Sequence, residues 1–351
     1  MNKRKLMALM LAGVMTFAMS ACGGASGTND ADNSASEDTA AEQTDDSAAD
    51  EASGDSYTVG VVQLVQHPAL DAATEGFEAA IKEELGDSVT VDVENAAGDS
   101  AQCATIANGF VSSGYDLIMA NATPALQAAQ AATADIPIVG TSITDYATAL
   151  SIDDWTGTTG MNITGYSDLA PLDEQADMLE EWFPVDSYPN VGIVYCSAEP
   201  NSKYQSTVIT EALEGKGYAV KEYTFADTND VASVVDTACK DNEVLYIPTD
   251  NTAASCTENI RNVAVPANTP IICGEEGICQ GCGVATLSIS YYDMGYQAGK
   301  QAADILANGT DPATTEIGYA TDLTKEYNAE ICEEMGLTPL DGYEAIAVSE
   351  E

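Results

Sequence analysis

Basic residues are scarce in this chain, and the shortage limits what it can bind. The 11 Lys and Arg stand against 57 Asp and Glu, which gives a formal net charge of -46. Three of those bases, Lys3, Arg4 and Lys5, lie at the very N-terminus. A nucleic-acid backbone is held by stripes of Lys and Arg, so we expect no nucleic-acid partner. The same shortage argues against a strongly anionic ligand such as a sugar phosphate.

Histidine is almost absent, and the common catalytic motifs are missing. His67 is the only histidine, so no His-rich metal site can form. Neither a G-x-S-x-G elbow nor a glycine-rich phosphate loop occurs. Cys279 and Cys282 have the spacing of half a zinc motif, but no second pair accompanies them, so a disulfide or free thiols explain them better. We therefore expect no enzyme activity, no cofactor and no metal.

The long uncharged run of this sequence lies at its start. Lys3 to Lys5 precede the apolar segment from Leu6 to Ala21, a pattern typical of a secretory signal over residues 1–21. Ser20-Ala21-Cys22-Gly23 resembles a bacterial lipobox, with Met19 where Leu is usual, and this predicts a lipid-modified (palmitate-bearing) Cys22. We expect an extracytoplasmic protein anchored to the cell membrane by lipid. The alternative is an ordinary secretory signal with an incidental cysteine.

Large apolar side chains are also missing from the segment after Cys22. From Gly23 to Ser56 there is no aromatic residue, no aliphatic residue larger than Ala and no Lys or Arg. Such a segment cannot bury enough apolar surface to offset the entropy lost on ordering. We predict that residues 22–56 form an acidic, disordered linker and that folding starts at Tyr57.

Strand-like and helix-like segments alternate from Tyr57 onward. Most of the strand-like runs are continuously apolar, as expected of parallel strands covered on both faces. This alternation predicts an α/β protein with doubly wound parallel sheets. Four strands precede a Gly/Thr-rich passage at 156–165, so we expect two Rossmann-like lobes rather than one large sheet. The expected strands are 57–65, 89–94, 116–120, 136–140, 191–195, 218–225, 244–247, 270–274 and 284–289.

Polar turns follow most of these strands. In doubly wound sheets the ligand lies beyond the carboxyl ends of the strands, so the turn residues are the candidates for ligand binding. Each of them has an alternative role as a local helix cap, for which Asp, Asn, Ser and Thr are common. The candidates are Gln66, His67, Asp99, Thr123, Pro124, Asp145, Asn201, Ser202, Asp250 and Asn251.

These turns resemble the tryptophan-binding (TrpX-like) group of ABC transporter substrate-binding proteins. The resemblance rests on HPALD at 67–71, NAAGD at 95–99, ATPALQA at 122–128, NITGYSD at 162–168, EPNS at 199–202 and PTDN at 248–251. It departs from the family at Gln66, where Glu is usual, and at Tyr146, where Pro is common. These departures concern the ligand more than the fold.

The resemblance implies a periplasmic-binding-protein fold of type I, in which three crossover segments join the lobes. Lobe 1 is then expected over 57–165 and 290–316, and lobe 2 over 166–289 and 317–347. It also implies a monomer that passes a small ligand to an ABC permease with its ATPase. An aromatic or hydrophobic amino acid, tryptophan first, is the ligand that the family suggests.

An amino acid needs donors for its carboxylate and an acceptor for its ammonium group. Thr123-Pro124 opens a predicted helix, whose free N–H groups and Thr123 hydroxyl can bind an anion without any Arg. Asp250 is the predicted ammonium acceptor, oriented by Asn251 or Asn201. Trp155, Tyr291 and Tyr292 are candidates for stacking on an aromatic ligand.

Two other functions fit parts of the sequence. A sugar or nucleoside receptor has the same expected fold, but it needs more aromatic platforms and polar cleft residues than we can assign. A surface enzyme or an adhesin is a third class, and the missing catalytic motifs argue against the enzyme.

Overall fold

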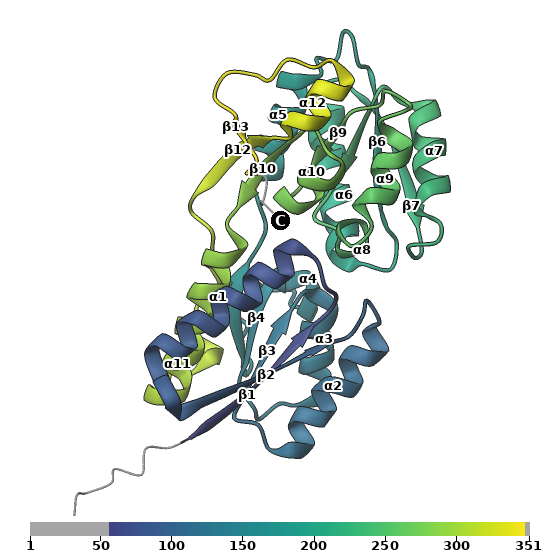
Figure 1. The fold of residues 1–351 in the computed structure, drawn as a ribbon. Helices are drawn as coiled ribbons and strands as arrows, with labels where there is room; N and C mark the ends of the chain where they lie inside the picture. Colours follow the sequence, from purple (N-terminus) through teal and green to yellow (C-terminus); the bar gives the residue numbers. More distant parts are fainter. Residues whose placement is uncertain (1–55, 348–351) are drawn as a thin grey trace, which may run out of the picture. The chain divides into compact units, whose positions relative to one another are not determined.

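Two mainly parallel β-sheets organise the computed structural model, which describes residues 56–347 (Figure 1). The first sheet is parallel throughout, in the order β11-β5-β4-β3-β1-β2. Its strands are β1 (Tyr57–Gln63), β2 (Val89–Asn95), β3 (Leu117–Asn121), β4 (Ile138–Ile143), β5 (Ile163–Ser167) and β11 (Gly318–Tyr319). With the helices α1 (Pro68–Leu85), α2 (Ser100–Ser113), α3 (Thr123–Ala132), α4 (Tyr146–Leu150) and α11 (Tyr291–Asn308), it forms lobe 1.

The second sheet has the order β13-β12-β10-β9-β8-β6-β7, and only the β10–β12 pair is antiparallel. Its strands are β6 (Asn190–Cys196), β7 (Ala219–Phe225), β8 (Val244–Ile247), β9 (Ile271–Cys273), β10 (Ala285–Ile289), β12 (Leu323–Tyr327) and β13 (Glu344–Ala345). Lobe 2 adds α5 (Leu172–Trp182), α6 (Pro200–Gly215), α7 (Val231–Asp241), α8 (Asn251–Ala254), α9 (Thr257–Ala264), α10 (Glu276–Cys282) and α12 (Ala329–Met335). Two short 3-10 helices, Gly86–Ser88 and Pro312–Thr314, complete the elements.

The chain passes between the lobes three times, after β5, after β10 and after β11. This arrangement confirms the expected α/β fold with two doubly wound lobes. The expected lobe boundary at 165/166 falls inside β5, and the boundary at 316/317 precedes β11, which pairs with β5. The end of β5 and the whole of β11 were expected in lobe 2, but both belong to the first sheet, in lobe 1.

Four strands were not expected from the sequence: β5, β11, β12 and β13. β5 carries the polar sequence ITGYS, and its Gly165 has a positive φ of 145°. β11 and β13 have two residues each, and β12 is an antiparallel strand with mixed polarity. None of them has the continuous apolar pattern that identifies a buried parallel strand.

Each sheet is covered by apolar side chains of its helices. In lobe 1, Phe77 and Ile81 of α1 pack with Ala298 and Ala302 of α11 against Val59 and its neighbours in the sheet. In lobe 2, Trp182 and Phe183 at the end of α5 lie in a cluster with Tyr246 of β8. No helix among residues 56–347 is long and apolar enough to cross a membrane.

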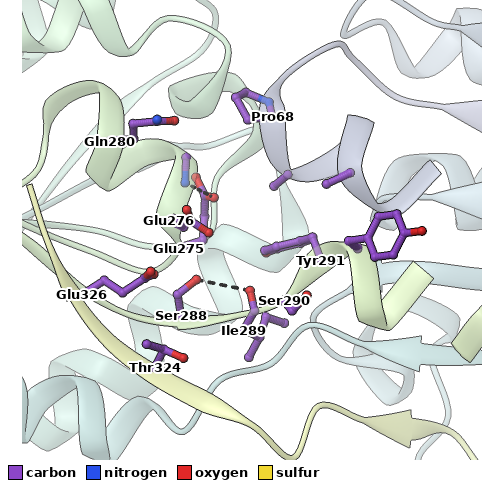
Figure 2. Close-up of a pocket in the computed structure, with 14 residues that line it drawn as sticks. Pro68, Glu275, Glu276, Gln280, Ser288, Ile289, Ser290, Tyr291, Thr324 and Glu326 are labelled. Carbon is purple, nitrogen blue, oxygen red and sulfur yellow. Dashed lines mark hydrogen bonds between the residues drawn. The ribbon is translucent and has the colours of Figure 1, made fainter. Parts of the chain in front are cut away.

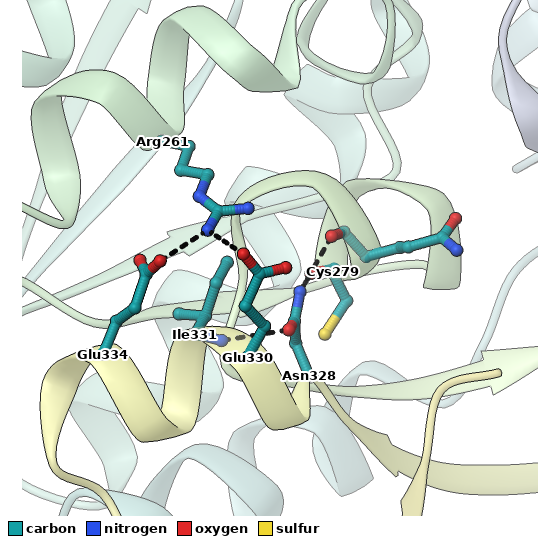
Figure 3. A network of polar contacts seen from close by, with 7 residues as sticks. Arg261, Cys279, Asn328, Glu330, Ile331 and Glu334 are labelled. Atoms are coloured by element: carbon teal, nitrogen blue, oxygen red, sulfur yellow. Dashed lines mark hydrogen bonds and ion pairs between the residues drawn. The ribbon is translucent and has the colours of Figure 1, made fainter. Parts of the chain in front are cut away.

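A polar network attaches α12 to the rest of lobe 2 (Figure 3). Arg261 of α9 donates to Glu330 and to Glu334, both at 2.8 Å. The Asn328 side chain caps α12 by accepting from Ile331 N (3.1 Å), and its Nδ2 donates to the carbonyl of Cys279 (3.0 Å). The chain after the last crossover is thereby tied to both α9 and α10.

The closest helix contact in lobe 1 joins α1 and α11, and it depends on glycine. A Cβ on Gly76 would lie 2.1 Å from the Tyr292 carbonyl oxygen, and a Cβ on Gly295 would lie 2.0 Å from the Ala73 carbonyl oxygen. Backbone meets backbone at both positions, so no side chain can move aside to make room. The two helices can approach this closely only without a Cβ at these sites.

We expect Gly295→Ala to lower the free energy of unfolding by about 1–3 kcal/mol, because the added methyl group overpacks a rigid contact. The control is Gly109→Ala in α2, where a Cβ meets nothing within 4 Å. That change should raise stability by about 0.5–1 kcal/mol through helix propensity alone. Urea unfolding followed by circular dichroism measures both variants. Equal effects of the two substitutions would contradict the proposed packing.

Candidate ligand-binding site

Buried polar side chains from both lobes meet where the carboxyl ends of the two sets of strands face each other. His67, before α1, contacts Asn251 of α8 through Nε2 and Oδ1 at 3.3 Å. Gln205 of α6 donates to the Thr144 hydroxyl at 3.5 Å. These contacts join lobe 1 to lobe 2, and His67, Asn251, Thr144 and Gln205 are all buried.

Several polar atoms in this region are buried without a hydrogen-bond partner among residues 56–347. A buried unpaired polar group costs about 1–3 kcal/mol, so a group of them requires an explanation. They lie at or just after the carboxyl ends of β1, β3, β4 and β6, which is where ligands bind in this class of fold. The atoms are His67 Nδ1, Asn121 Oδ1, Thr123 Oγ1, Thr141 Oγ1, Ser142 Oγ and Asn201 Oδ1.

The start of α3 is built to receive an anion. No side chain caps this helix: its N-cap residue, Ala122, has a φ of 91°, and Pro124 follows in the first turn. Thr123 is only 3% exposed, and its hydroxyl is one of the unpaired groups. The first N–H groups of a helix have no partner within the helix, and its dipole favours negative charge. These groups provide donors for a carboxylate.

Backbone strain is concentrated at the same strand ends. Three residues other than glycine have a positive φ there. They are Ala97 after β2 (53°), Ala122 after β3 (91°) and Ser142 within β4 (57°). The pairing of β4 with β5 shifts register between Gly140 and Ile143, around Ser142. Each such conformation costs on the order of 1–3 kcal/mol and is typical of binding sites held in a fixed geometry.

Asp168 is a buried carboxylate in the first crossover segment, directly after β5. It is 4% exposed, and it accepts hydrogen bonds from the Thr144 hydroxyl and from the Tyr291 hydroxyl, both at 3.0 Å. Burial raises the pKa of Asp168 to about 6, although these two hydrogen bonds oppose the shift. No basic side chain is among the groups that shift the pKa of Asp168. Its negative charge is therefore not neutralised by the protein, and a cationic group of a ligand could pair with it.

The carboxylates of Asp250 and Glu199 are occupied by hydrogen bonds from backbone N–H groups within lobe 2. Asp250 caps α8 by accepting from Ala253 N (2.8 Å), and its second oxygen accepts from Cys196 N (2.6 Å). Burial and the neighbouring Glu199 raise the pKa of Asp250. Glu199 accepts from the backbone N–H of Asn251 (3.0 Å) and of Thr252 (2.8 Å). These contacts favour the capping alternative for Asp250 over its predicted contact with the ligand.

The other predicted residues divide into two groups. His67, Thr123, Pro124, Asn201, Ser202 and Asn251 are brought together at the facing strand ends, all of them buried. Gln66 is exposed, and Asp99 is exposed and caps α2 through Ala101 N (2.8 Å). Half-buried Asp145 caps α4 through Thr148 N (2.7 Å), and it also lines a crevice with Thr123 and Asn201.

Sequence reasoning did not select Asp168, Ser142, Thr144 or Gln205. A signal for two of them was present: Asp168 ends the NITGYSD motif, and Gln205 lies one helical turn after Asn201. Ser142 is identified only by its φ and its burial, which the sequence does not reveal.

A cavity of about 390 Å³ is lined by Tyr291, the hydrogen-bond partner of Asp168, and by residues of α1, α10 and β10 (Figure 2). The start of α1 contributes an apolar wall, with Pro68 and Ala69, and Tyr291 lies beside it. The opposite wall, from lobe 2, contains Glu275 and Glu326. Burial raises the pKa of each of these glutamates to about 7. None of the lining residues is basic, so the cavity suits neutral or cationic groups.

A second cavity of about 210 Å³ lies at the turns after β1, β2 and β6, where Leu64, Gly98 and Pro124 face Glu199 and Asn251. Among the residues that the structure describes, no three His, Cys, Asp or Glu side chains are arranged to hold a metal ion. The arrangement therefore suits the binding of a small polar organic molecule.

Comparison with known proteins agrees with this geometry. Residues 58–348 match the model of the family described as ABC transporter substrate binding protein. The chain is 32% identical over 321 residues to a tyrosine-binding protein of Clostridioides difficile (strain R20291), covering 90% of this chain and 88% of that protein.

Two solved structures are similar to the whole described region. The first is an ABC domain from Streptococcus pneumoniae in complex with L-Trp, with a TM-score of 0.78 and 29% identity, covering 83% of this chain and 100% of that one. The second is a ligand-free, open substrate-binding protein with adhesive properties from Clostridium difficile. It has a TM-score of 0.64 and 30% identity, and the match covers 84% of this chain and 100% of that one.

The pKa of Asp168 predicts a pH-dependent cost to stability. A carboxyl whose pKa is raised from 3.8 to about 6 by folding destabilises the protein above pH 6, and this cost disappears as the pH falls toward 4. We expect Asp168→Asn to raise the free energy of unfolding by up to about 3 kcal/mol at pH 7.5. The gain should shrink steadily between pH 6 and pH 4.5 in urea titrations.

The control is Asp186→Asn, which makes the same charge change at an exposed loop position. It should have little effect at any of these pH values. An Asp168→Asn gain that is the same at pH 4.5 and pH 7.5 would contradict the assigned cause.

Proposed function

The chain belongs to the ABC transporter substrate-binding proteins, and from this membership we propose that it binds an amino acid with an aromatic or hydrophobic side chain between its two lobes. Members of this family are substrate-binding proteins and not enzymes. The observation that carries the proposal is the group of unpaired, buried polar atoms contributed by both lobes. Tyrosine and L-Trp are the ligands named for the similar proteins.

The carboxylate of the ligand is bound by lobe 1. Its donors are the first N–H groups of α3 and the hydroxyls of Thr123 and Ser142. Hydrogen bonds to a charged group are about twice as strong as neutral ones, and here they form away from water. An anion can thus be held by a chain that has very few bases.

The ammonium group is bound by acceptors that line the other side of the site. Asp168 supplies a buried negative charge, and Asn201 Oδ1 is an unpaired acceptor on lobe 2. Thr123 and Asn201 border the same crevice. The carboxylate is thus held by lobe 1, and Asn201 of lobe 2 helps to hold the ammonium group. A bound amino acid therefore contacts both lobes at once and stabilises their closed arrangement.

The side chain of the ligand extends toward the 390 Å³ cavity. Tyr291 and Ile289 supply an aromatic ring and an aliphatic group there, beside Pro68 and Ala69. Offset stacking with a tyrosine ring adds about 0.5–1.5 kcal/mol to the area that an aromatic ligand buries.

The protein is further proposed to be the extracytoplasmic, lipid-anchored component of an importer, acting as a monomer with a permease and its ATPase. The support is the basic and apolar N-terminal pattern followed by the lipobox-like Ser20-Ala21-Cys22-Gly23. The signal over 1–21, the lipidated Cys22 and the acidic linker over 22–56 lie outside the described residues, except for Ser56.

Ligand binding is tested by thermal unfolding with L-Trp, L-Tyr and L-Leu beside a panel of sugars and nucleosides. A ligand at 100 times its dissociation constant stabilises by about 2.7 kcal/mol. We expect at least one of the amino acids to raise the midpoint. A response to a sugar or nucleoside with none to any amino acid would support the alternative receptor and overturn the proposal.

The variant Thr123→Val removes one donor to the carboxylate and should weaken binding by about 10- to 100-fold. Thr105→Val is the matched control, because Thr105 is exposed on α2 and bonds only the Ala101 carbonyl. Titration calorimetry measures both affinities. Equal affinities would remove the start of α3 from the site without affecting the amino-acid assignment.

The lipid anchor is tested by growing expressing bacteria with radiolabelled palmitate. We expect the label in the wild-type chain and its loss in Cys22→Ser. Cys103→Ser is the control, because that thiol lies buried in lobe 1. Labelling that persists in Cys22→Ser would show that the lipid is not on Cys22, and an unlabelled wild-type chain would show that there is none.

A further inference from the structure

Three thiols converge beneath α10, in the core of lobe 2. Cys273 ends β9, and Cys279 and Cys282 lie on α10. Each of the three is at most 1% exposed, and all three are free thiols. The Cys273 thiol lies within hydrogen-bonding reach of both of the others. Free thiols were one of the two expectations for Cys279 and Cys282.

The contacts favour Cys279 over Cys282 as the partner of Cys273. A Cβ built on Gly283 would lie 2.1 Å from Cys273 Sγ and 3.0 Å from the Cα of Cys279, so the Cys273 thiol lies close to the backbone of α10 at Cys279. The thiol of Cys282 also donates to the Ile278 carbonyl, at 3.3 Å. Figure 3 shows Cys279 on α10, where its carbonyl accepts from Asn328.

We propose that Cys273 and Cys279 form a disulfide when a small-molecule disulfide such as oxidised glutathione reaches them, and that this bond ties α10 to β9. A thiolate of the pair attacks one sulfur of the oxidant and releases one reduced thiol, which leaves a mixed disulfide. The second cysteine then displaces the other reduced thiol. Two protein thiols are oxidised, and the two electrons and two protons pass to the two sulfurs of the oxidant.

The burial of the pair determines when this reaction occurs. Burial raises the pKa of both thiols, and the neighbouring thiols add to this effect at Cys273. A buried thiol with little thiolate character exchanges slowly. The disulfide therefore forms during folding, or when α10 opens locally. Once lobe 2 has folded around the bond, burial protects it from reduction.

The position of α10 connects this reaction to the ligand-binding region. Glu275, the N-cap of α10, and the helical residues Glu276 and Gln280 line the 390 Å³ cavity. A covalent bond between α10 and β9 restricts the motion of this wall relative to the sheet. The inference does not depend on the identity of the ligand.

The experiment refolds the protein from urea with oxidised glutathione, so that every thiol is accessible, then alkylates the remaining thiols and maps peptides without reduction. We expect the number of alkylated thiols to fall by two, with Cys273 joined to Cys279, and dithiothreitol to restore both. Full alkylation of Cys273 and Cys279 after this treatment would overturn the proposal.

Variants identify the partners. Cys273→Ser should abolish the bond, whereas Cys282→Ser should retain it, and Cys103→Ser, at a buried thiol of lobe 1, should leave it unchanged. A bond between Cys279 and Cys282 in the wild-type chain would overturn the assignment. Peptide mapping of the wild-type protein decides the matter even if a variant fails to refold.

Discussion

The packing of α11 against α1 is the contact on which the architecture of this protein depends. α11 follows β10, a strand of lobe 2, yet it belongs to lobe 1, where Gly76, Gly295 and Gly299 let the two helix backbones touch. The chain must therefore return to lobe 1 and then leave it again. This return brings Tyr291, the first residue of α11, to Asp168 in another crossover segment, where their side chains bond at 3.0 Å. A packing constraint inside one lobe thus positions polar groups between the two.

Much of this fold could be predicted from the sequence, because parallel strands buried on both faces leave continuous apolar runs. The strands 191–195 and 244–247 correspond closely to β6 and β8. The family resemblance, which rested on the turns after the strands, is confirmed by the family match and the similar proteins. What the sequence could not reveal was β5, whose polar residues are buried only because β4 and β11 flank it.

The site was predicted less completely, because capping residues and ligand-binding residues are of the same types. Asp250 and Asp168 look alike in the sequence, yet Asp250 is held by the distant N–H of Cys196 while Asp168 accepts only from hydroxyls. That difference arises from tertiary contacts. The helix start at Thr123-Pro124 was predicted correctly, because Pro124 marks the first turn and this signal is local.

The absence of basic side chains around the site has a kinetic consequence. Long-range attraction of a solute depends on net charge, whereas hydrogen bonds from a helix start act only at contact. A protein with a net charge of -46 repels anionic solutes well before they touch it, while a zwitterion, which has no net charge, approaches without that barrier. The electrostatic field of the whole molecule thus sorts solutes during diffusion, and the proposed carboxylate site at the start of α3 acts only on those that arrive.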